Sequence, residues 1–388
     1  MWLVWLLYFL QFAAVAAFSA YINVYLRDAG LSGVQIGIVN MAGWLASVGA
    51  SPAWGYISDR SGKPRLLMAV GAIGAMAVTQ LVPFVSSFWL FLLITIGANF
   101  LGSAPSTLAD STAMVLLGAR REDYGRYRLG GSFGFVIAGV SAGFIYQQLG
   151  LRVMFPAYGV FMTGFALVAL LLPPVKVKLE SSGRREIWGM VRQPAWFVFI
   201  LTIFLIWVGG NAVFSFLNVS LSAMGASDSL IGIAYTISTV FEIPFMFFSG
   251  ALLRRYGPAR LLTAGLALMT VRCFLLGWMP APGWSVAINV LNGPGWVFFW
   301  ASSVNYANRL APRGMAGTAQ GLLSSSMNLA SVASSLLSGW LFDALGPTGL
   351  FRVMGFISLA ALLVFLGRGL VRSQASQAES AASKDVAG

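Results

Sequence analysis

Three charged residues lie inside long apolar stretches of the sequence: Asp110, Glu242 and Arg272. A charged side chain at the centre of a bilayer costs roughly 2.5 to 3.5 kcal/mol, so we expect these residues to face a wet cavity or one another. Low dielectric raises the pKa of a carboxyl group, and an adjacent guanidinium lowers it. We predict that Glu242 carries a proton with Arg272 as its partner, and that Asp110 also takes part in proton coupling. A purely structural ion pair is the alternative.

A second group of residues is suited to binding a polar solute. Arg128 follows Asp110 by 18 residues, and the two would form the N-terminal part of such a site. Because Arg128 is near the end of its apolar stretch, an ordinary loop arginine is the alternative. Aromatic and amide side chains would complete the site, and we select Tyr21, Asn23, Asn211, Asn292 and Trp296.

The residues that are missing exclude several classes of protein. The chain has no histidine and one cysteine, Cys273, which excludes His-ligated metals, an intrachain disulfide and Ser-His or Cys-His catalysis. No Gly-x-x-x-x-Gly-Lys-(Ser/Thr) loop for ATP occurs. We therefore expect no enzyme activity, no metal and no cofactor, and a proton gradient as the energy source.

The elements that position these residues are predicted to be membrane-spanning helices. Of the 388 residues, 58% are hydrophobic and 9% are charged, against about 25% charged in soluble proteins. A helix needs about 20 apolar residues to cross a bilayer. Twelve stretches qualify: 2–26, 34–57, 66–85, 88–116, 129–149, 153–172, 195–221, 230–253, 261–279, 284–308, 315–341 and 350–370. The first resembles a signal peptide only in its small residues, and we predict a retained helix.

The basic residues set the predicted orientation. If there are twelve crossings, both termini and the even-numbered loops share one side, which holds every lysine and arginine except Arg27, Arg152, Arg272 and Arg352. That side should be cytoplasmic by the positive-inside rule. The net charge of +12 then indicates contact with anionic lipid headgroups rather than nucleic acid. We expect a monomer in the inner (cytoplasmic) membrane.

An internal repeat divides the chain into two halves. At an offset of 195 residues, residues 36–38 align with 231–233, and the glycines and arginines of 55–65 align with those of 250–260. We predict a six-helix bundle over 1–172, a cytoplasmic linker over 173–194, a second six-helix bundle over 195–372 and a disordered tail over 373–388. Two such bundles can rock about a central site, as in many secondary transporters.

The loop after the second stretch carries a recognisable motif. Residues 55–65 read GYISDRSGKPR, which resembles the signature Gly-x-x-x-Asp-Arg-x-Gly-(Arg/Lys) of the major facilitator superfamily. The resemblance implies that charge contacts between helix ends close the cytoplasmic side, and loop solubility is the alternative. The predicted gate residues are Gly55, Asp59, Arg60, Gly62 and, in the degenerate second copy, Arg255.

Within that superfamily the chain resembles the lactose permease, phenylpropionate permease and nucleoside symporter group. The resemblance rests on residues 124–128 and 131–135, on Pro105, on Asp110 with Arg128, and on Glu242 with Arg272. It implies sugar recognition by the first pair, and sugar binding with proton coupling by the second. The tenth stretch departs from the group, because Leu291, Asn292 and Gly293 stand where many relatives have a histidine.

The expected function is proton-coupled symport of a small polar organic solute by alternating access. Sugars, nucleosides and organic acids all fit the charged residues. Two alternatives remain: an exporter of the same fold, and a transporter-like sensor that binds solute without moving it.

Overall fold

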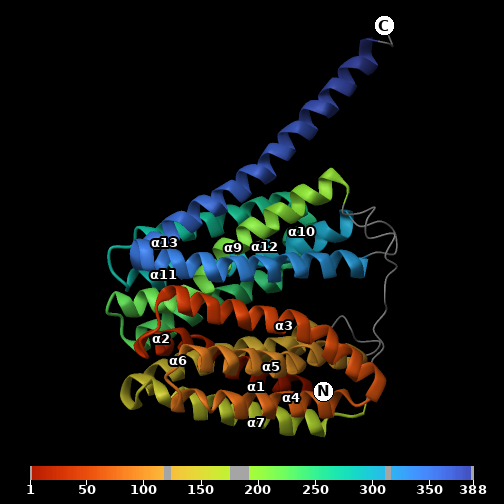
Figure 1. Ribbon diagram of the computed structural model, residues 1–388. Coiled ribbons are helices and arrows are strands. Elements are labelled where there is room, and N and C mark those ends of the chain that lie inside the picture. Colours follow the sequence, from red (N-terminus) through yellow and green to blue (C-terminus); the bar gives the residue numbers. More distant parts are fainter. Residues whose placement is uncertain (1, 118–123, 175–191, 311–315, 386–388) are drawn as a thin grey trace.

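The computed structural model describes residues 2–117, 124–174, 192–310 and 316–385, which form helices and no β-strand (Figure 1). The first half contains α1 (Trp2–Ser19), α2 (Ile22–Asp28), α3 (Gly33–Ser61), α4 (Pro64–Thr79), η1 (Val82–Phe84), α5 (Phe88–Leu117), α6 (Tyr124–Leu149), η3 (Leu151–Val153) and α7 (Met154–Leu171). The second contains α9 (Pro194–Ala223), α10 (Asp228–Gly277), α11 (Trp284–Val290), α12 (Asn292–Leu310) and α13 (Ala316–Asp385).

The described helices include nine that are long and apolar enough to cross a membrane. Two of these, in α10 and α13, are 50 and 49 residues long, about twice what one crossing requires. Their backbones are non-helical at Gly257 and Gly346, each followed by a proline inside the assigned helix. The all-helical membrane fold is therefore confirmed, and the number of twelve crossings stays a prediction.

The internal repeat extends to the backbone turns. Positive φ angles in the described residues occur only at glycine, the residue that tolerates them without steric cost. These glycines form three pairs at the same offset of 195 or 196 residues: Gly30 with Gly225, Gly62 with Gly257, and Gly150 with Gly346. Ser32 and Ser227, also 195 apart, cap the helices that follow. The two halves thus reverse direction at corresponding positions.

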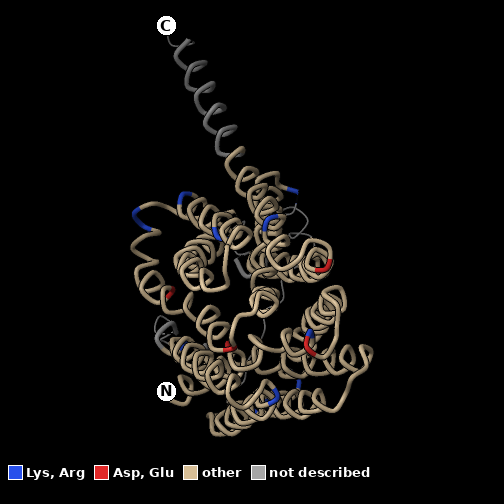
Figure 2. Tube along the Cα trace, turned by 90° about the vertical axis from the view of Figure 1, so that its left-hand side faces the viewer, with Lys and Arg blue, Asp and Glu red and all other residues tan. Residues whose placement is uncertain are grey.

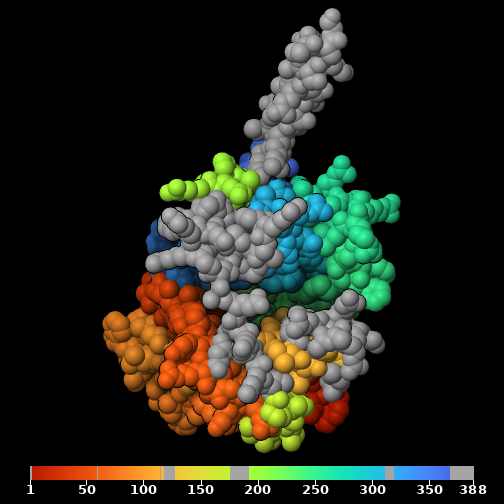
Figure 3. Space-filling view, turned by 90° about the vertical axis from the view of Figure 1, so that its right-hand side faces the viewer, coloured from red at the N-terminus to blue at the C-terminus, as the bar shows by residue number. Residues whose placement is uncertain are grey.

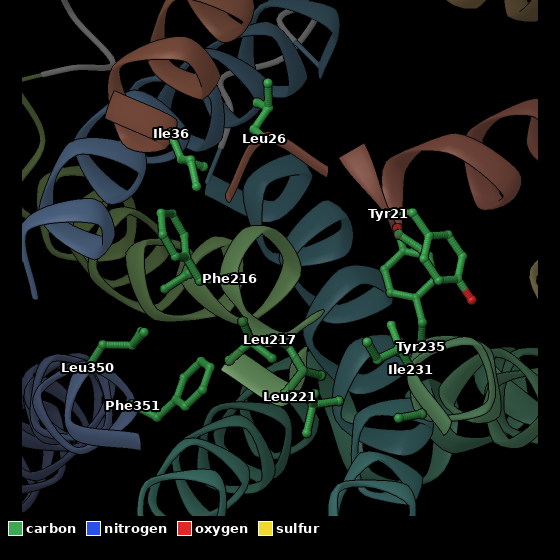
Figure 4. Close-up of a cluster of buried hydrophobic side chains, with 14 of the residues drawn as sticks. Tyr21, Leu26, Ile36, Phe216, Leu217, Leu221, Ile231, Tyr235, Leu350 and Phe351 are labelled. Carbon is green, nitrogen blue, oxygen red and sulfur yellow. The ribbon is translucent and has the colours of Figure 1, made fainter. Parts of the chain in front are cut away.

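The halves lie one against the other, with the N-terminal half below the C-terminal half in Figure 1 and in the view of Figure 3. Hydrogen bonds and close backbone approaches join the halves among residues 20–37, 215–232 and 335–343, which we call the closed end. Apolar side chains from both halves meet there, among them Leu26, Ile36, Phe216 and Ile231 (Figure 4). The helix ends beside 118–123, 175–191 and 311–315 lie at the opposite end of the molecule (Figure 1).

Hydrogen bonds join the halves at the closed end. Asn218 Nδ2 donates to the Ala20 carbonyl at 2.7 Å, and Tyr21 Oη donates to the Asp228 carbonyl at 3.0 Å. The Asp343 carboxylate of α13 accepts from the backbone amides of Gly33 and Val34, at 2.7 and 2.8 Å. A carboxylate at a helix N-terminus is stabilised by the unpaired N–H groups and the helix dipole. Asp343 therefore caps α3 across the interface between the halves.

The structure continues α13 to Asp385, and in Figure 1 this last part of the helix stands away from the bundle. Alanine, the strongest helix former, occupies positions 375, 378, 381 and 382 there. The disordered tail over 373–388 stays a prediction, as do the bounds of the two bundles and of the linker.

Candidate functional site

A cavity of about 560 Å³ lies at the interface between the halves, within the usual range for small-molecule sites. Most of its lining comes from α1, α3 and α5, and the second half contributes Phe214 and Ser215 of α9 and Asn328 of α13. The lining is rich in amide and hydroxyl side chains, including Gln11, Asn40 and Asn99. Every lining residue is uncharged, and charged residues are sparse along the described trace as a whole (Figure 2).

Small residues give the closed end its tight fit. A Cβ atom added at Gly37 would collide with the Ser335 carbonyl, and one at Gly339 would collide with the Gly33 carbonyl. The backbones of α3 and α13 therefore approach more closely than side chains would permit, as is usual where membrane helices cross. This contact closes the interface beyond the cavity.

Asp110 and Arg128 lie close to the same tyrosine, which sequence reasoning did not select. Tyr8 Oη donates a hydrogen bond to Asp110 Oδ1 at 2.7 Å. The Arg128 guanidinium carbon lies 6.0 Å from the centre of the Tyr8 ring and 4.8 Å from that of Phe12, which are cation–π distances. Asp110 and Arg128 are both exposed. Tyr8 of α1 thus lies beside both members of the predicted pair, whose role in solute binding stays a prediction.

The Arg272 guanidinium is satisfied by amides. Arg272 is 9% exposed, and its Nε and Nη2 donate to Asn289 Oδ1 at 2.9 and 2.6 Å, while its Nη1 donates to Asn292 Oδ1 at 2.6 Å. Asn289 Nδ2 in turn donates to the Ala234 carbonyl at 3.0 Å. These three residues, the arginine cluster, link α10 with the following α11 and α12.

Glu242, also on α10, is half-buried, and Arg128, in the other half, is near enough for its positive charge to influence the Glu242 carboxylate. In the described residues the hydrogen bonds of Arg272 go to amide oxygens, and its pairing with Glu242 stays a prediction. Buried amide oxygens can hold a guanidinium as a carboxylate would, which the order of residues along α10 could not reveal.

The remaining predicted solute residues are spread over several environments. Asn23 lines the cavity. Tyr21 is buried at the closed end and bonds across the halves. Asn211 is buried between α9 and α13, where its Nδ2 donates to the Ser331 carbonyl at 3.3 Å. Trp296 stacks on Trp300 with ring centres 5.4 Å apart. The structure brings Asn23 to the cavity and places the other three outside its lining.

The predicted gate residues lie at the ends of their helices away from the closed end. Gly55 is buried in α3, and Gly62 ends that helix with φ of 63°. Arg60 is exposed and donates to Tyr56 Oη at 3.2 Å. Arg255 stacks over Tyr256, 5.3 Å from the ring centre. The Asp59 side chain is outside the described part, and the gating role stays a prediction.

Comparison with known proteins identifies the family. The model of the MFS_1 like family matches residues 1–353, and the chain belongs to that family. Among curated proteins, maltose permease of Geobacillus stearothermophilus is 27% identical over 349 residues, covering 89% of this chain and 88% of the permease. A probable 3-phenylpropionic acid transporter of Escherichia coli (strain K12) is 26% identical over 361 residues, covering 89% and 92%.

Solved structures show the same fold. The crystal structure of the nucleoside transporter NupG superposes with a TM-score of 0.81 at 16% identity, covering 94% of this chain and 98% of that one. The chain is therefore a multi-pass membrane transporter for small solutes, of the major facilitator type.

Proposed function

We propose that this protein is a proton-coupled symporter that carries a small polar organic solute across the inner membrane by alternating access. The observation that carries the proposal is the cavity at the interface of two halves that are hydrogen-bonded to each other at one end. Rocking of the halves about such a cavity would open it to each side of the membrane in turn.

The charged residues support proton coupling. Glu242 is half-buried on α10 of the second half, and Arg128, whose positive charge is near enough to influence it, lies on α6 of the first half. Rocking of the halves changes the distance between these two charges. Since the energy of a charge pair depends on its separation, proton binding at Glu242 is coupled to the conformation.

The energy available to such a symporter is sufficient for useful accumulation. One proton entering down a membrane potential of 100 mV supplies about 2.3 kcal/mol. Because each 1.4 kcal/mol corresponds to a factor of ten, this would sustain about a 50-fold solute gradient. A single titrating carboxylate therefore suffices.

Purified protein in proteoliposomes tests the proposal. An imposed inward proton gradient should drive accumulation of labelled maltose, uridine or 3-phenylpropionate, the classes suggested by the relatives. Glu242→Gln should abolish accumulation while solute exchange continues. The matched control is Asp385→Asn, at the C-terminal end of α13, which stands away from the bundle, and this variant should accumulate normally. Full accumulation by Glu242→Gln would reject the role of this carboxylate.

The same experiment separates the two alternatives. An exporter would accumulate solute only under the opposite orientation of the gradient. A sensor would bind solute but show neither accumulation nor exchange. The likeness to a maltose permease supports uptake.

A further inference from the structure

The polar groups of the cavity include several that have no partner in the described residues. Asn23 is 6% exposed, and its Nδ2 donates to the Ser215 carbonyl at 2.7 Å while its Oδ1 is unpartnered. Gln11 Oε1 and Asn40 Nδ2 are also buried and unpartnered. All three residues line the cavity. A buried polar atom left without a hydrogen bond costs about 1 to 3 kcal/mol. These three atoms are themselves covered, so a solute would recover that free energy by bonding to them once the side chains rotate toward the cavity.

We propose that this amide-lined cavity, and not the charged group on α5, α6 and α10, is the solute site, and that it takes a neutral, hydroxyl-rich solute. The inference rests on the proposed function and names the substrate class within it. It makes the cavity residues Gln11, Asn23, Asn40 and Asn99 the specificity-determining residues.

The chemistry of the lining selects the solute class. A hydroxyl group both donates and accepts, and a side-chain amide offers both an acceptor and donors, so the two are complementary. A carboxylate solute would enter a low-dielectric cavity with no Lys or Arg in the lining to compensate its charge, which is costly. A cationic solute would likewise find no carboxylate there. Organic acids and amines are therefore disfavoured.

Aromatic residues complete the site for a ring-shaped solute. Trp44 on α3, Phe18 on α1 and Tyr158 on α7 line the same cavity. Aromatic faces provide apolar contact for the C–H surface of a sugar or a nucleoside, while the amides meet its hydroxyl groups. A mainly apolar wall with a few placed polar groups is usual for small-molecule sites.

The location of the cavity separates solute binding from proton binding. Asp110, Arg128, Glu242 and Arg272 are all absent from its lining. Solute and proton would then be coupled through the movement of the halves rather than through a shared group. Asn328 and Ser215 reach the cavity from the second half, so the solute contacts both moving bodies.

Thermal unfolding of the purified full-length protein tests the solute class, since a ligand of the folded state raises the melting midpoint. Maltose and uridine serve as neutral probes and 3-phenylpropionate as the acidic probe. At least one neutral probe should raise the midpoint, and the acid should not. Asn40→Leu should weaken that binding tenfold or more, while Asn305→Leu, an exposed asparagine of α12, should leave it unchanged. Stabilisation by the acid alone, or by no neutral probe, would overturn the proposal.

A labelling experiment locates the site without altering its amides. Ser47 lines the cavity, and the native Cys273 is buried, so a Ser47→Cys variant offers one accessible thiol. The stabilising neutral probe should slow its modification several-fold. Unchanged labelling at saturating probe would place the solute elsewhere. If Glu242→Gln still accumulates solute, the proposed proton coupling fails but this site stands. If Glu242→Gln loses accumulation while Asn40→Leu binds normally, this inference fails alone.

Discussion

Asparagines occupy two polar regions of the interior in opposite ways. In the arginine cluster, Asn289 accepts twice from Arg272 and donates to a backbone carbonyl, so both its amide oxygen and its amide nitrogen have partners. At the cavity, Asn23 and Asn40 each retain an amide atom that is buried and unpartnered among the described residues. The same residue type is thus structural where its hydrogen bonds are complete and suited to binding where they are not. Satisfaction of polar groups separates the two regions better than residue type does.

The arginine cluster should show the largest loss of stability. Asn289→Leu removes the acceptor of two guanidinium N–H groups and leaves a buried charge partly unpaired. The expected cost is about 3 kcal/mol or more, measured as the free energy of unfolding in mixed micelles. Asn305→Leu, whose amide bonds only within its own helix, is the control and should change it little. If the two substitutions lowered the free energy of unfolding equally, the hydrogen bonds of Asn289 to Arg272 would not be the cause of the loss.

The closed end should set the conformation through the hydrogen bonds that join the two halves there. Asp343→Ala removes two charge-assisted hydrogen bonds between the halves, each worth about 1.5 to 3 kcal/mol. Even partial replacement by water should shift the equilibrium toward opening of this end by tenfold or more. The measurement is the rate of thiol labelling at Ser335→Cys, which is buried beside Gly37.

A local cap of the same helix provides the control for that experiment. Ser32 accepts from the Gln35 amide at the start of α3, within the first half. Ser32→Ala should lower stability by about 1 kcal/mol and leave labelling of the cysteine at position 335 unchanged. A rise in labelling with Ser32→Ala equal to that with Asp343→Ala would show that fraying of α3, rather than contact between the halves, controls access.

Substitutions at Tyr8 test whether its hydrogen bond to Asp110 serves stability or transport. Tyr8→Phe removes the 2.7 Å hydrogen bond to Asp110 but keeps the ring near Arg128. If the hydrogen bond is structural, the free energy of unfolding should fall by about 0.5 to 1.5 kcal/mol, with proton-driven uptake retained. Tyr8→Leu, which also removes the ring, should weaken both. Loss of uptake in Tyr8→Phe without loss of stability would assign the tyrosine to transport.

The sequence predicted the fold and its symmetry because both depend on local signals. Apolar length gave the helices, and the offset between halves recurs in the positive-φ glycines, such as Gly62 and Gly257. Glycine where the chain reverses direction and serine at a helix N-cap are required by the local backbone geometry. They can therefore be predicted from the sequence without knowledge of tertiary contacts. The family assignment followed from the motif at 55–65, one of these turns.

The candidate site was only partly predictable, because hydrogen-bond satisfaction depends on neighbours far away in the chain. Nothing local to Glu242 reveals that Arg128, in the other half, is near enough for its charge to influence it. Nothing local to Asn40 distinguishes it from Asn211, which bonds to α13. The prediction of solute-binding residues favoured α5 and α10, because charged residues inside apolar stretches are conspicuous. The uncharged amides of α1 and α3 are less conspicuous in the sequence. The cue that the sequence offered is the presence of several amides, Gln11, Asn23 and Asn40, within the first two apolar stretches.

The smallest change in stability is expected at the cavity itself. Asn40→Leu removes an amide whose Nδ2 has no partner in the described residues, so no hydrogen bond of that donor is lost on substitution. The desolvation penalty of the unpartnered group disappears, and the free energy of unfolding should be unchanged within about 0.5 kcal/mol or slightly raised. Asn289→Leu, measured under the same conditions, makes the same substitution at an asparagine whose amide oxygen and nitrogen both have partners. If Asn40→Leu lowered the free energy of unfolding as much as Asn289→Leu does, Asn40 would have a structural role. The cavity would then resemble the arginine cluster rather than a binding site.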